Sequence, residues 1–300
     1  MNLWQNYIRP KTLSEAMDAY ATAPRPLIPI AGGTDLLLDL EQGRHSPVQT
    51  LIDVTSVAEM NALEVRGDEL YIGAAVPVNR VATTPEVIRH AQALTEACNL
   101  IAGPQVRNVA TLGGNVAHAL PAADGTIALL ALNAQADVSA LSGAERSRSA
   151  STRRIPFKEL FLGPGKSSLK HGEELLVGFH LPLATHHKSS CFKRIMRPQG
   201  VALPIINVAV WLERTDDVIS QIRIAVGPGG PTPWSGKEAE KILLGKPLND
   251  ETFDAAVEAL LAQVGFRSSA RRASSDYRRH IVVGLFKDVL ETAWSRASNH

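Results

Sequence analysis

Apolar residues follow two different patterns along the chain, one before and one after about residue 180. In the first part, short apolar runs alternate with segments whose apolar residues recur every three or four positions. The apolar runs predict strands over 27–30, 50–54, 70–74 and 173–182. The helical segments are 12–23, which Thr12 or Ser14 can cap, and 36–40, 86–101 and 127–132. This alternation predicts an α/β domain over residues 1–180.

The second part groups its strands ahead of its helices. Strands are predicted over 191–195, 206–214 and 218–226, and a short turn at 215–217 joins the last two. Helices are predicted over 237–244, 250–263 and 274–296. We therefore expect a C-terminal α+β domain over residues 187–295, with a three-stranded antiparallel sheet and helices. The Ser- and Arg-rich segment 144–154 is expected to be a polar excursion at the surface.

Composition and charge exclude several classes of protein. The 300 residues are 45% hydrophobic and 20% charged, and 31 Lys and Arg against 30 Asp and Glu give a net charge of +1. This balance excludes the broad basic surface of a nucleic-acid-binding protein. The arginines near the C-terminus are expected to form a solvated or subunit-contacting face: Arg267, Arg271, Arg272, Arg278 and Arg279. With no signal peptide and no apolar stretch that could span a bilayer, we expect a cytoplasmic protein without a membrane span.

The cysteine count limits the metal chemistry of this chain. Cys98 and Cys191 are its two cysteines, too few for a four-cysteine iron–sulfur cluster or an all-thiolate zinc site. A disulfide between them is one reading, and two inert core thiols is the simpler one. His186 and His187 are adjacent, so they are interpreted as a loop pair and not as metal ligands. We predict no metal ligands in this chain.

Two glycine pairs carry the candidate chemistry. The strand over 27–30 leads into Gly32 and Gly33, and a second pair, Gly113 and Gly114, follows another apolar segment that is expected to be a strand. Glycine lets backbone N–H groups approach an anion closely, and two such loops could hold the two phosphoryl groups of a diphosphate. Taken alone, the first loop over residues 31–35 is more simply read as a structural turn, and the second pair is what favours a binding site. Neither a Rossmann fingerprint nor a P-loop is present, since Leu160 occupies the position of the first P-loop glycine.

The residues around both pairs resemble a known family. Residues 30–36 (IAGGTDL) and 102–115 (AGPQVRNVATLGGN) are similar to the FAD-binding medium subunit of molybdenum hydroxylases, of the bacterial xanthine dehydrogenase and carbon monoxide dehydrogenase type. The similarity continues in order through 121–124, 129–132, 174–176, 192–194, 231–233 and 267–278. It therefore covers essentially the whole chain.

The resemblance implies an α+β fold: a vanillyl-alcohol-oxidase (PCMH)-like FAD-binding domain of two α/β subdomains, followed by the C-terminal domain. It also implies which residues contact FAD. Those in and before the first loop are Ile28, Pro29, Ile30, Ala31, Gly32, Gly33, Thr34 and Asp35, and those in the second are Thr111, Gly113, Gly114 and Asn115. Outside the loops they are Ile101 and Leu176 beside the flavin ring, Asp124 on the adenosine side, and Lys193 near the ring. Without the resemblance, Asp124 reads as a helix cap, Leu176 as strand core and Lys193 as a solvated lysine.

The implied function is electron transfer within a complex. The resemblance implies that [2Fe–2S] clusters on a small subunit and a molybdopterin cofactor on a large subunit deliver electrons to FAD on this chain. An external acceptor such as NAD then takes them, although residues 197–200 depart from the family pattern at that point. The substrate binds another chain, so this sequence does not identify it. The alternatives are a stand-alone FAD-dependent reductase of similar fold and an assembly module without flavin, which both intact loops oppose.

Overall fold

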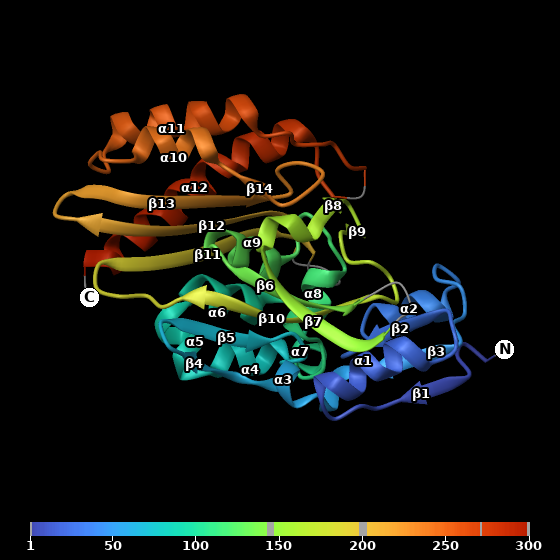
Figure 1. Cartoon of the computed structure of the whole chain (residues 1–300). Coiled ribbons are helices and arrows are strands. Elements are labelled where there is room, and N and C mark those ends of the chain that lie inside the picture. Colours follow the sequence, from blue (N-terminus) through green and yellow to red (C-terminus); the bar gives the residue numbers. More distant parts are fainter. Residues whose placement is uncertain (1, 143–146, 198–202, 271, 299–300) are drawn as a thin grey trace.

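A parallel three-stranded sheet forms first along the chain. β1 (Asn6–Ile8) and β2 (Leu27–Ile30) pair on either side of β3 (Thr50–Asp53). α1 (Leu13–Thr22) leads from β1 to β2, and α2 (Leu36–Glu41) follows β2. Of the two predicted caps, Thr12 is the one used, because its side chain accepts a hydrogen bond from the Glu15 amide. The computed structural model describes residues 2–142, 147–197, 203–270 and 272–298 (Figure 1).

An antiparallel five-stranded sheet completes the first domain. Its strands in spatial order are β4 (Leu63–Arg66), β5 (Glu69–Gly73), β10 (Glu174–Pro182), β6 (Gln135–Ser142) and β7 (Ser147–Pro156). The helices between β5 and β6 are α4 (Val78–Thr83), α5 (Pro85–His90), α6 (Gln92–Leu100), α7 (Pro104–Arg107), α8 (Leu112–Ala117) and α9 (Asp124–Ala131). The short elements are α3 (Ala58–Asn61), the 3-10 turns Val54–Ser56 and Phe157–Leu160, and the hairpin of β8 (Phe161–Gly163) and β9 (Lys166–Ser167).

Two segments of this domain differ from their predictions. The helix expected over 86–101 is two helices, because Ala91 leaves helical geometry with φ −141° and ψ 54° between α5 and α6. The segment 144–154, expected to be a polar excursion at the surface, is exposed over residues 151–154 but has regular structure. Its described part lies mostly in β7, which pairs antiparallel with β6, and residues 143–146 lie outside the described chain.

The C-terminal part forms an antiparallel sheet with helices. β11 (Lys188–Met196), β12 (Pro204–Thr215) and β13 (Val218–Gly227) match the predicted strands, and α10 (Lys237–Leu243), α11 (Asp250–Gln263) and α12 (Ser275–Ser298) match the predicted helices. The sheet has four strands where we predicted three. The fourth, β14 (Trp234–Ser235), pairs with Ala225 and Val226 and is too short to give an alternating pattern. The predicted α+β class is confirmed.

Both faces of the C-terminal sheet are buried. On one face Phe192, Ala209 and Ala225 belong to the core of the first domain, and α6 and α9 contact this sheet. On the other face Cys191, Val208 and Val210 pack in a second core with α10, α11 and α12. Figure 1 shows α9 beside this sheet and α10 and α11 on its far side. No described helix is long and apolar enough to cross a membrane.

Candidate functional site

The first glycine loop has a run of unused backbone donors. Within the described residues, no hydrogen-bond acceptor is paired with the N–H groups of Gly32, Gly33, Thr34 and Asp35. The Leu37 N–H, by contrast, donates a hydrogen bond to the Gly33 carbonyl oxygen at 3.0 Å. Gly33 has φ +67°, a conformation that places successive N–H groups on one side of the chain. The loop is partly exposed. It therefore offers four consecutive donors to an anion from solution.

The two glycine loops lie against each other. A side chain at Gly32 would collide with the Val109 carbonyl oxygen and would approach the Ala110 backbone. The absence of a side chain at Gly32 is what lets the first loop touch the segment that leads into the second glycine pair. The structure thus brings the two sequence motifs together, as the prediction of one shared site requires.

The second glycine pair differs from its prediction. It does not follow a strand, because the residues before it make only a single bridge, Pro77 with Thr111, and the pair lies in the first turn of α8. The Gly113 N–H donates to the Ala74 carbonyl at 2.9 Å, and the Gly114 N–H donates to Thr111 Oγ1 at 3.1 Å. Both amides are therefore occupied. Gly114 is exposed and leaves room for a ligand to approach, but it does not offer its N–H.

Orphaned polar atoms lie next to the second loop. The side-chain oxygen Asn115 Oδ1 is buried and has no hydrogen-bond partner in the described structure, and the same is true of Thr126 Oγ1. A side chain at Gly125 would come within 2.8 Å of Asn115 Oδ1, so the start of α9 packs directly on Asn115. Buried polar atoms normally have partners, so a polar ligand that reaches this point would satisfy atoms that the chain leaves unsatisfied.

Asp124 is the first residue of α9, and its side chain is hydrogen-bonded by two residues of the C-terminal sheet. Its carboxylate accepts hydrogen bonds from Arg194 Nη1 and, at 2.7 Å, from Asn207 Nδ2. The Asp124 and Arg194 side chains are 5% and 4% exposed. Burial raises the pKa of the Asp124 carboxyl, while the charge of Arg194 and the hydrogen bond from Asn207 act in the opposite direction. The structure caps α9 with Ala123, so the alternative reading of Asp124 as the cap residue is wrong.

Sequence reasoning did not identify Arg194 or Asn207 as site residues. Signals for both were present: Arg194 adjoins Lys193 in a segment that carries the family resemblance, and Asn207 is a polar interruption in an apolar strand. Their partner, however, is 70 or more residues away in sequence, and only the folded chain brings the three side chains together.

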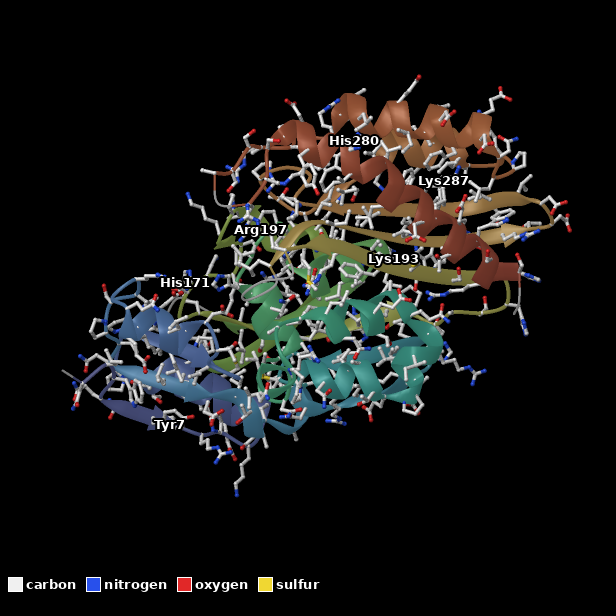
Figure 2. The ribbon with its side chains drawn as sticks, turned by 180° about the vertical axis from the view of Figure 1, so that it is seen from behind. Tyr7, His171, Lys193, Arg197, His280 and Lys287 are labelled. Atoms are coloured by element: carbon white, nitrogen blue, oxygen red, sulfur yellow. The ribbon has the colours of Figure 1, made fainter. Side chains whose placement is uncertain are left out.

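The Lys193 side chain lies on the face of β11 opposite to that of Arg194. Its Nζ bonds Asp288 at 2.6 Å and Thr292 at 3.2 Å, both on α12. Successive residues of a strand point to opposite faces, so Arg194 faces Asp124 while Lys193 faces α12. Figure 2 labels Lys193 beside α12. The described hydrogen bonds of Lys193 are with α12, and the basic residue beside Asp124 is Arg194.

The apolar residues assigned to the ring differ in exposure. Leu176 is 5% exposed and packs in the core of β10, as its alternative reading expected. Ile101 directly follows α6 and is half-buried. Arg107 Nη1 donates a hydrogen bond to the Ile101 carbonyl oxygen at 3.0 Å. In β2, Ile28 and Pro29 are half-buried and Ile30 is buried. Three large apolar side chains near the second loop that sequence reasoning missed are more than a third exposed: Val106, Val109 and Leu120.

Other candidate features lie apart from this site. Cys98 and Cys191 are free and buried, and burial raises the pKa of Cys191 to about 12, so the reading as inert core thiols holds. Arg278 is buried and donates to the Ile205 and Arg267 carbonyls, so it is not part of a solvated face, and Arg271 lies outside the described residues. The described residues hold no group of side chains suited to a metal ion.

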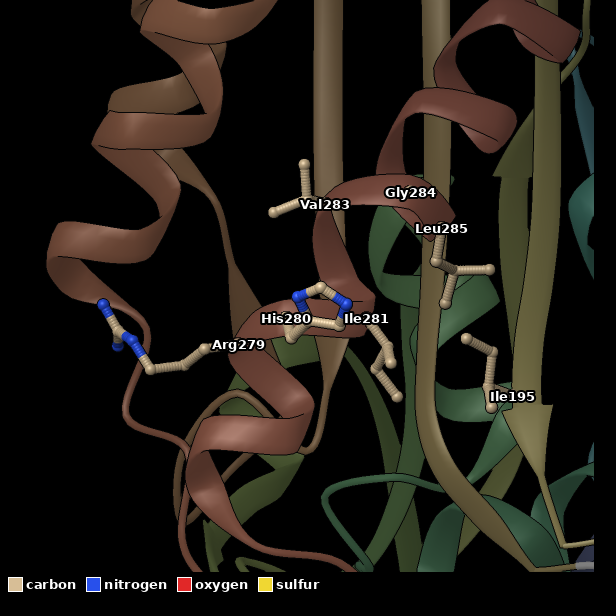
Figure 3. A pocket seen from close by; sticks show the side chains of 7 residues that line it. All are labelled: Ile195, Arg279, His280, Ile281, Val283, Gly284 and Leu285. Carbon is tan, nitrogen blue, oxygen red and sulfur yellow. The ribbon is translucent and has the colours of Figure 1, made fainter.

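A shallow hollow of about 790 Å³ lies along α12, away from both loops. Figure 3 shows the side chains around it, which come from α12 and from Ile195 of β11. None of the predicted site residues lines it. The hollow and the glycine loops are therefore separate features of the surface.

Comparisons with known proteins agree over the full length. Residues 3–184 match the family described as the FAD binding domain in molybdopterin dehydrogenase, and residues 190–293 match the CO dehydrogenase flavoprotein C-terminal domain. A putative xanthine dehydrogenase FAD-binding subunit of Escherichia coli K12 is 33% identical, and the medium subunit of nicotine 6-hydroxylase of Paenarthrobacter nicotinovorans is 31% identical, each with 97% of both chains covered. A chain of the solved carbon monoxide dehydrogenase of Hydrogenophaga pseudoflava is 27% identical, with a TM-score of 0.87 over 97% of this chain and 98% of that one.

Proposed function

Since this chain belongs to the family of FAD-binding medium subunits of molybdenum hydroxylases, we propose that it binds FAD between its two glycine loops and the start of α9. We propose further that it takes electrons from [2Fe–2S] clusters of a partner chain and passes them to an external acceptor such as NAD. The family itself, and the expected resemblance to it, are confirmed by the matches over both domains. The domain boundaries at 1–180 and 187–295 stay predictions.

The run of free amides from Gly32 to Asp35 is the observation that carries the proposal. A diphosphate is the part of FAD that needs several donors and no bulky side chain, and this loop supplies both. Asn115 offers a further polar group, because its buried Oδ1 lacks a partner in the described structure. A pyrophosphate itself accepts hydrogen bonds, so the Asn115 side-chain amide would turn its N–H₂ group toward the ligand, and this exchange of the two amide ends leaves the packing unchanged.

The apolar surface near the second loop suits a flat ring. Val106, Val109 and Leu120 expose apolar side chains, and Ile101 lies half-buried at the end of α6. Covering such side chains with an aromatic ring removes apolar surface from water, at about 25 cal/mol for each Å². When bound, FAD supplies the redox chemistry, and the residues of this chain hold it, shield it from water and set its surroundings.

The source of electrons must lie on another chain. A [2Fe–2S] cluster is held by four protein ligands, and this chain has two cysteines, both of them buried. The relatives are themselves described as FAD-binding or medium subunits, names that imply further subunits. We propose an iron–sulfur small subunit and a molybdenum-binding large subunit as partners.

Titration of the purified full-length chain with FAD tests the first part of the proposal. We expect saturable binding of one FAD per chain. The quenching of flavin fluorescence reports this binding. A chain that binds FMN or riboflavin as tightly as FAD would contradict a site built around the diphosphate and the adenosine. A chain that binds no flavin at all would overturn the proposed function.

Co-purification and reoxidation test the electron path. A tagged chain purified from the cells that naturally make it should carry along an iron–sulfur chain and a molybdenum-binding chain, whereas a chain that is active alone would favour the stand-alone reductase. The complex is reduced under anaerobic conditions and is then mixed with NAD or a quinone without oxygen, or in a separate run with oxygenated buffer, while the recovery of flavin absorbance is monitored. Rapid recovery with NAD is the expected result, and recovery with the other acceptors alone would refute that choice.

A further inference from the structure

Three buried side chains from both domains meet at the start of α9. Asp124 belongs to α9, Arg194 to β11 and Asn207 to β12. Arg194 Nη1 and Asn207 Nδ2 both donate to the Asp124 carboxylate, and Asn207 Nδ2 also donates to the Ala122 carbonyl at 3.0 Å. Asn207 is fully buried. The C-terminal sheet thus holds both the side chain at the beginning of α9 and the backbone just before it.

The cluster leaves some of its polar atoms unused. Arg194 Nε and Asn207 Oδ1 are buried and have no hydrogen-bond partner among the described residues. One is a donor and the other is an acceptor. The backbone makes room for this arrangement, since a side chain at Gly227 would collide with Asn207 Oδ1. A charged, incompletely satisfied cluster is costly to keep in a core that could be apolar, so stability alone does not account for it.

The cluster is connected to the glycine loops through α9. Gly125 follows Asp124 and packs on Asn115 of the second loop, while Thr126 contributes a further unsatisfied hydroxyl. The position of the Asp124 carboxylate therefore fixes the first turn of α9, and this turn fixes Asn115. A shift of the C-terminal sheet would be transmitted along this short path to the proposed FAD site.

We propose that Arg194 and Asn207 are positioning residues for FAD, which act through Asp124 and couple FAD binding to the seating of the C-terminal sheet on α9. This inference rests on the proposed function. Arg194 supplies the charged partner of a carboxyl group at a buried position, and Asn207 fixes the orientation of that group. FAD binding and domain contact then stabilise each other, because each requires the same placement of α9.

A second ion pair between the domains, more exposed than the pair of Asp124 and Arg194, provides a control. Arg296 of α12 bonds Glu96 of α6 at 2.5 Å and the Ser190 carbonyl at 2.8 Å. Like Arg194, Arg296 is an arginine of the C-terminal domain that pairs with a carboxylate of the first domain. The hydrogen bonds of the Arg296 side chain in the described structure involve neither Asp124 nor the glycine loops. Loss of Arg296 therefore measures what a general weakening of the domain contact does to FAD binding.

The test compares FAD dissociation constants of the full-length chain and of Arg194→Met, Arg194→Lys, Asn207→Ala and Arg296→Met. Thermal unfolding without FAD is measured for each of them. We expect Arg194→Met and Asn207→Ala to weaken FAD binding about tenfold or more, the effect of losing a hydrogen bond to a charged group. Arg194→Lys should recover part of the affinity, and Arg296→Met should lower the unfolding temperature without changing the affinity. If Arg194→Met does not fold, Arg194→Lys and Asn207→Ala decide.

The possible outcomes distinguish the positioning role of Arg194 and Asn207 from the proposed function, FAD binding, on which it rests. If the unchanged chain binds FAD and the Arg194 and Asn207 variants bind it equally well, the positioning role is overturned while the proposed function stands. The inference is also overturned if Arg296→Met weakens binding as much as Arg194→Met, since any domain contact would then suffice. If the unchanged chain binds no FAD, the proposed function fails, and the inference fails with it.

Discussion

The two glycine pairs look alike in sequence and do different things in the fold. In the first, four successive N–H groups from Gly32 to Asp35 lack an acceptor in the described structure. In the second, the N–H groups of Gly113 and Gly114 are both bonded within the chain. The first pair is arranged to receive a ligand, and the second is arranged to bring α8 close to its neighbours. A glycine pair in a sequence therefore does not by itself show whether the glycines bind a ligand or allow close packing.

The physical difference lies in what each missing side chain makes room for. At Gly113 a Cβ would lie 2.5 Å from both the Cβ and the carbonyl oxygen of Ala74. Those are backbone and near-backbone atoms that cannot turn aside. At Gly33 the nearest atoms would belong to the side chains of Leu37 and Ile30, at 3.0 and 3.2 Å, but the φ of +67° itself disfavours a side chain. Close packing requires the one glycine, and backbone conformation requires the other.

Gly113→Ala should give the largest effect, on stability. The added methyl group pushes α8 away from Ala74 and breaks the hydrogen bond from the Gly113 N–H, so we expect a loss of about 3 kcal/mol in the free energy of unfolding. Gly114→Ala is the matched control: its Cβ would meet only Thr111 Oγ1, at 3.1 Å, and the residue is exposed. Urea unfolding without FAD measures both. Equal losses in the two variants would contradict the packing role of Gly113.

Gly33→Ala should give the next largest effect, on FAD binding. A left-handed alanine costs about 1–2 kcal/mol, and the Cβ also pushes on Leu37 beneath the free amides. We expect the FAD dissociation constant to rise about tenfold, which corresponds to about 1.4 kcal/mol. Fluorescence titration gives the constant.

Gly43→Ala controls for backbone strain. Gly43 has φ +68° and lies shortly after α2, but a Cβ there would meet nothing within 4 Å. Gly43→Ala should lose stability through the same backbone strain, without the contact on Leu37, and should keep full FAD affinity. If both variants bind FAD as the unchanged chain does, the free amides of the first loop are not its binding site.

Most elements could be predicted from the sequence where the local signal was strong. The β2 bounds and the α11 bounds agree with the predicted ranges, because an apolar run and a capped amphipathic helix are local features. β7 was missed because its residues SRSASTRRIP are polar, and it is a strand through its pairing with β6. The break between α5 and α6 at Ala91 was not predicted, because no glycine or proline marks it in the sequence.

The site was predicted less completely, for the same reason. The first loop could be found because its glycines, its threonine and the preceding strand are contiguous in sequence. The occupied amides of the second loop depend on Ala74, and the charge beside Asp124 depends on Arg194, each of them distant in the chain. That Arg194 faces Asp124 and Lys193 faces α12 follows from the alternation of side chains along β11, and it could be assigned only after the register of β11 was known.

The threonines beside the two glycine pairs give the smallest and most selective test. Thr111 Oγ1 accepts from the Gly114 N–H as the cap of α8, so Thr111→Val should cost about 1 kcal/mol of stability with or without FAD. Thr34 has no side-chain hydrogen bond among the described residues, so Thr34→Val should unfold like the unchanged chain when FAD is absent. If the Thr34 hydroxyl joins the free amides in binding the diphosphate, this variant gains less stability from added FAD, and the deficit is the hydroxyl's share of binding. The reverse pattern, with Thr34→Val unstable alone and Thr111→Val weak in FAD binding, would exchange the roles of the two loops.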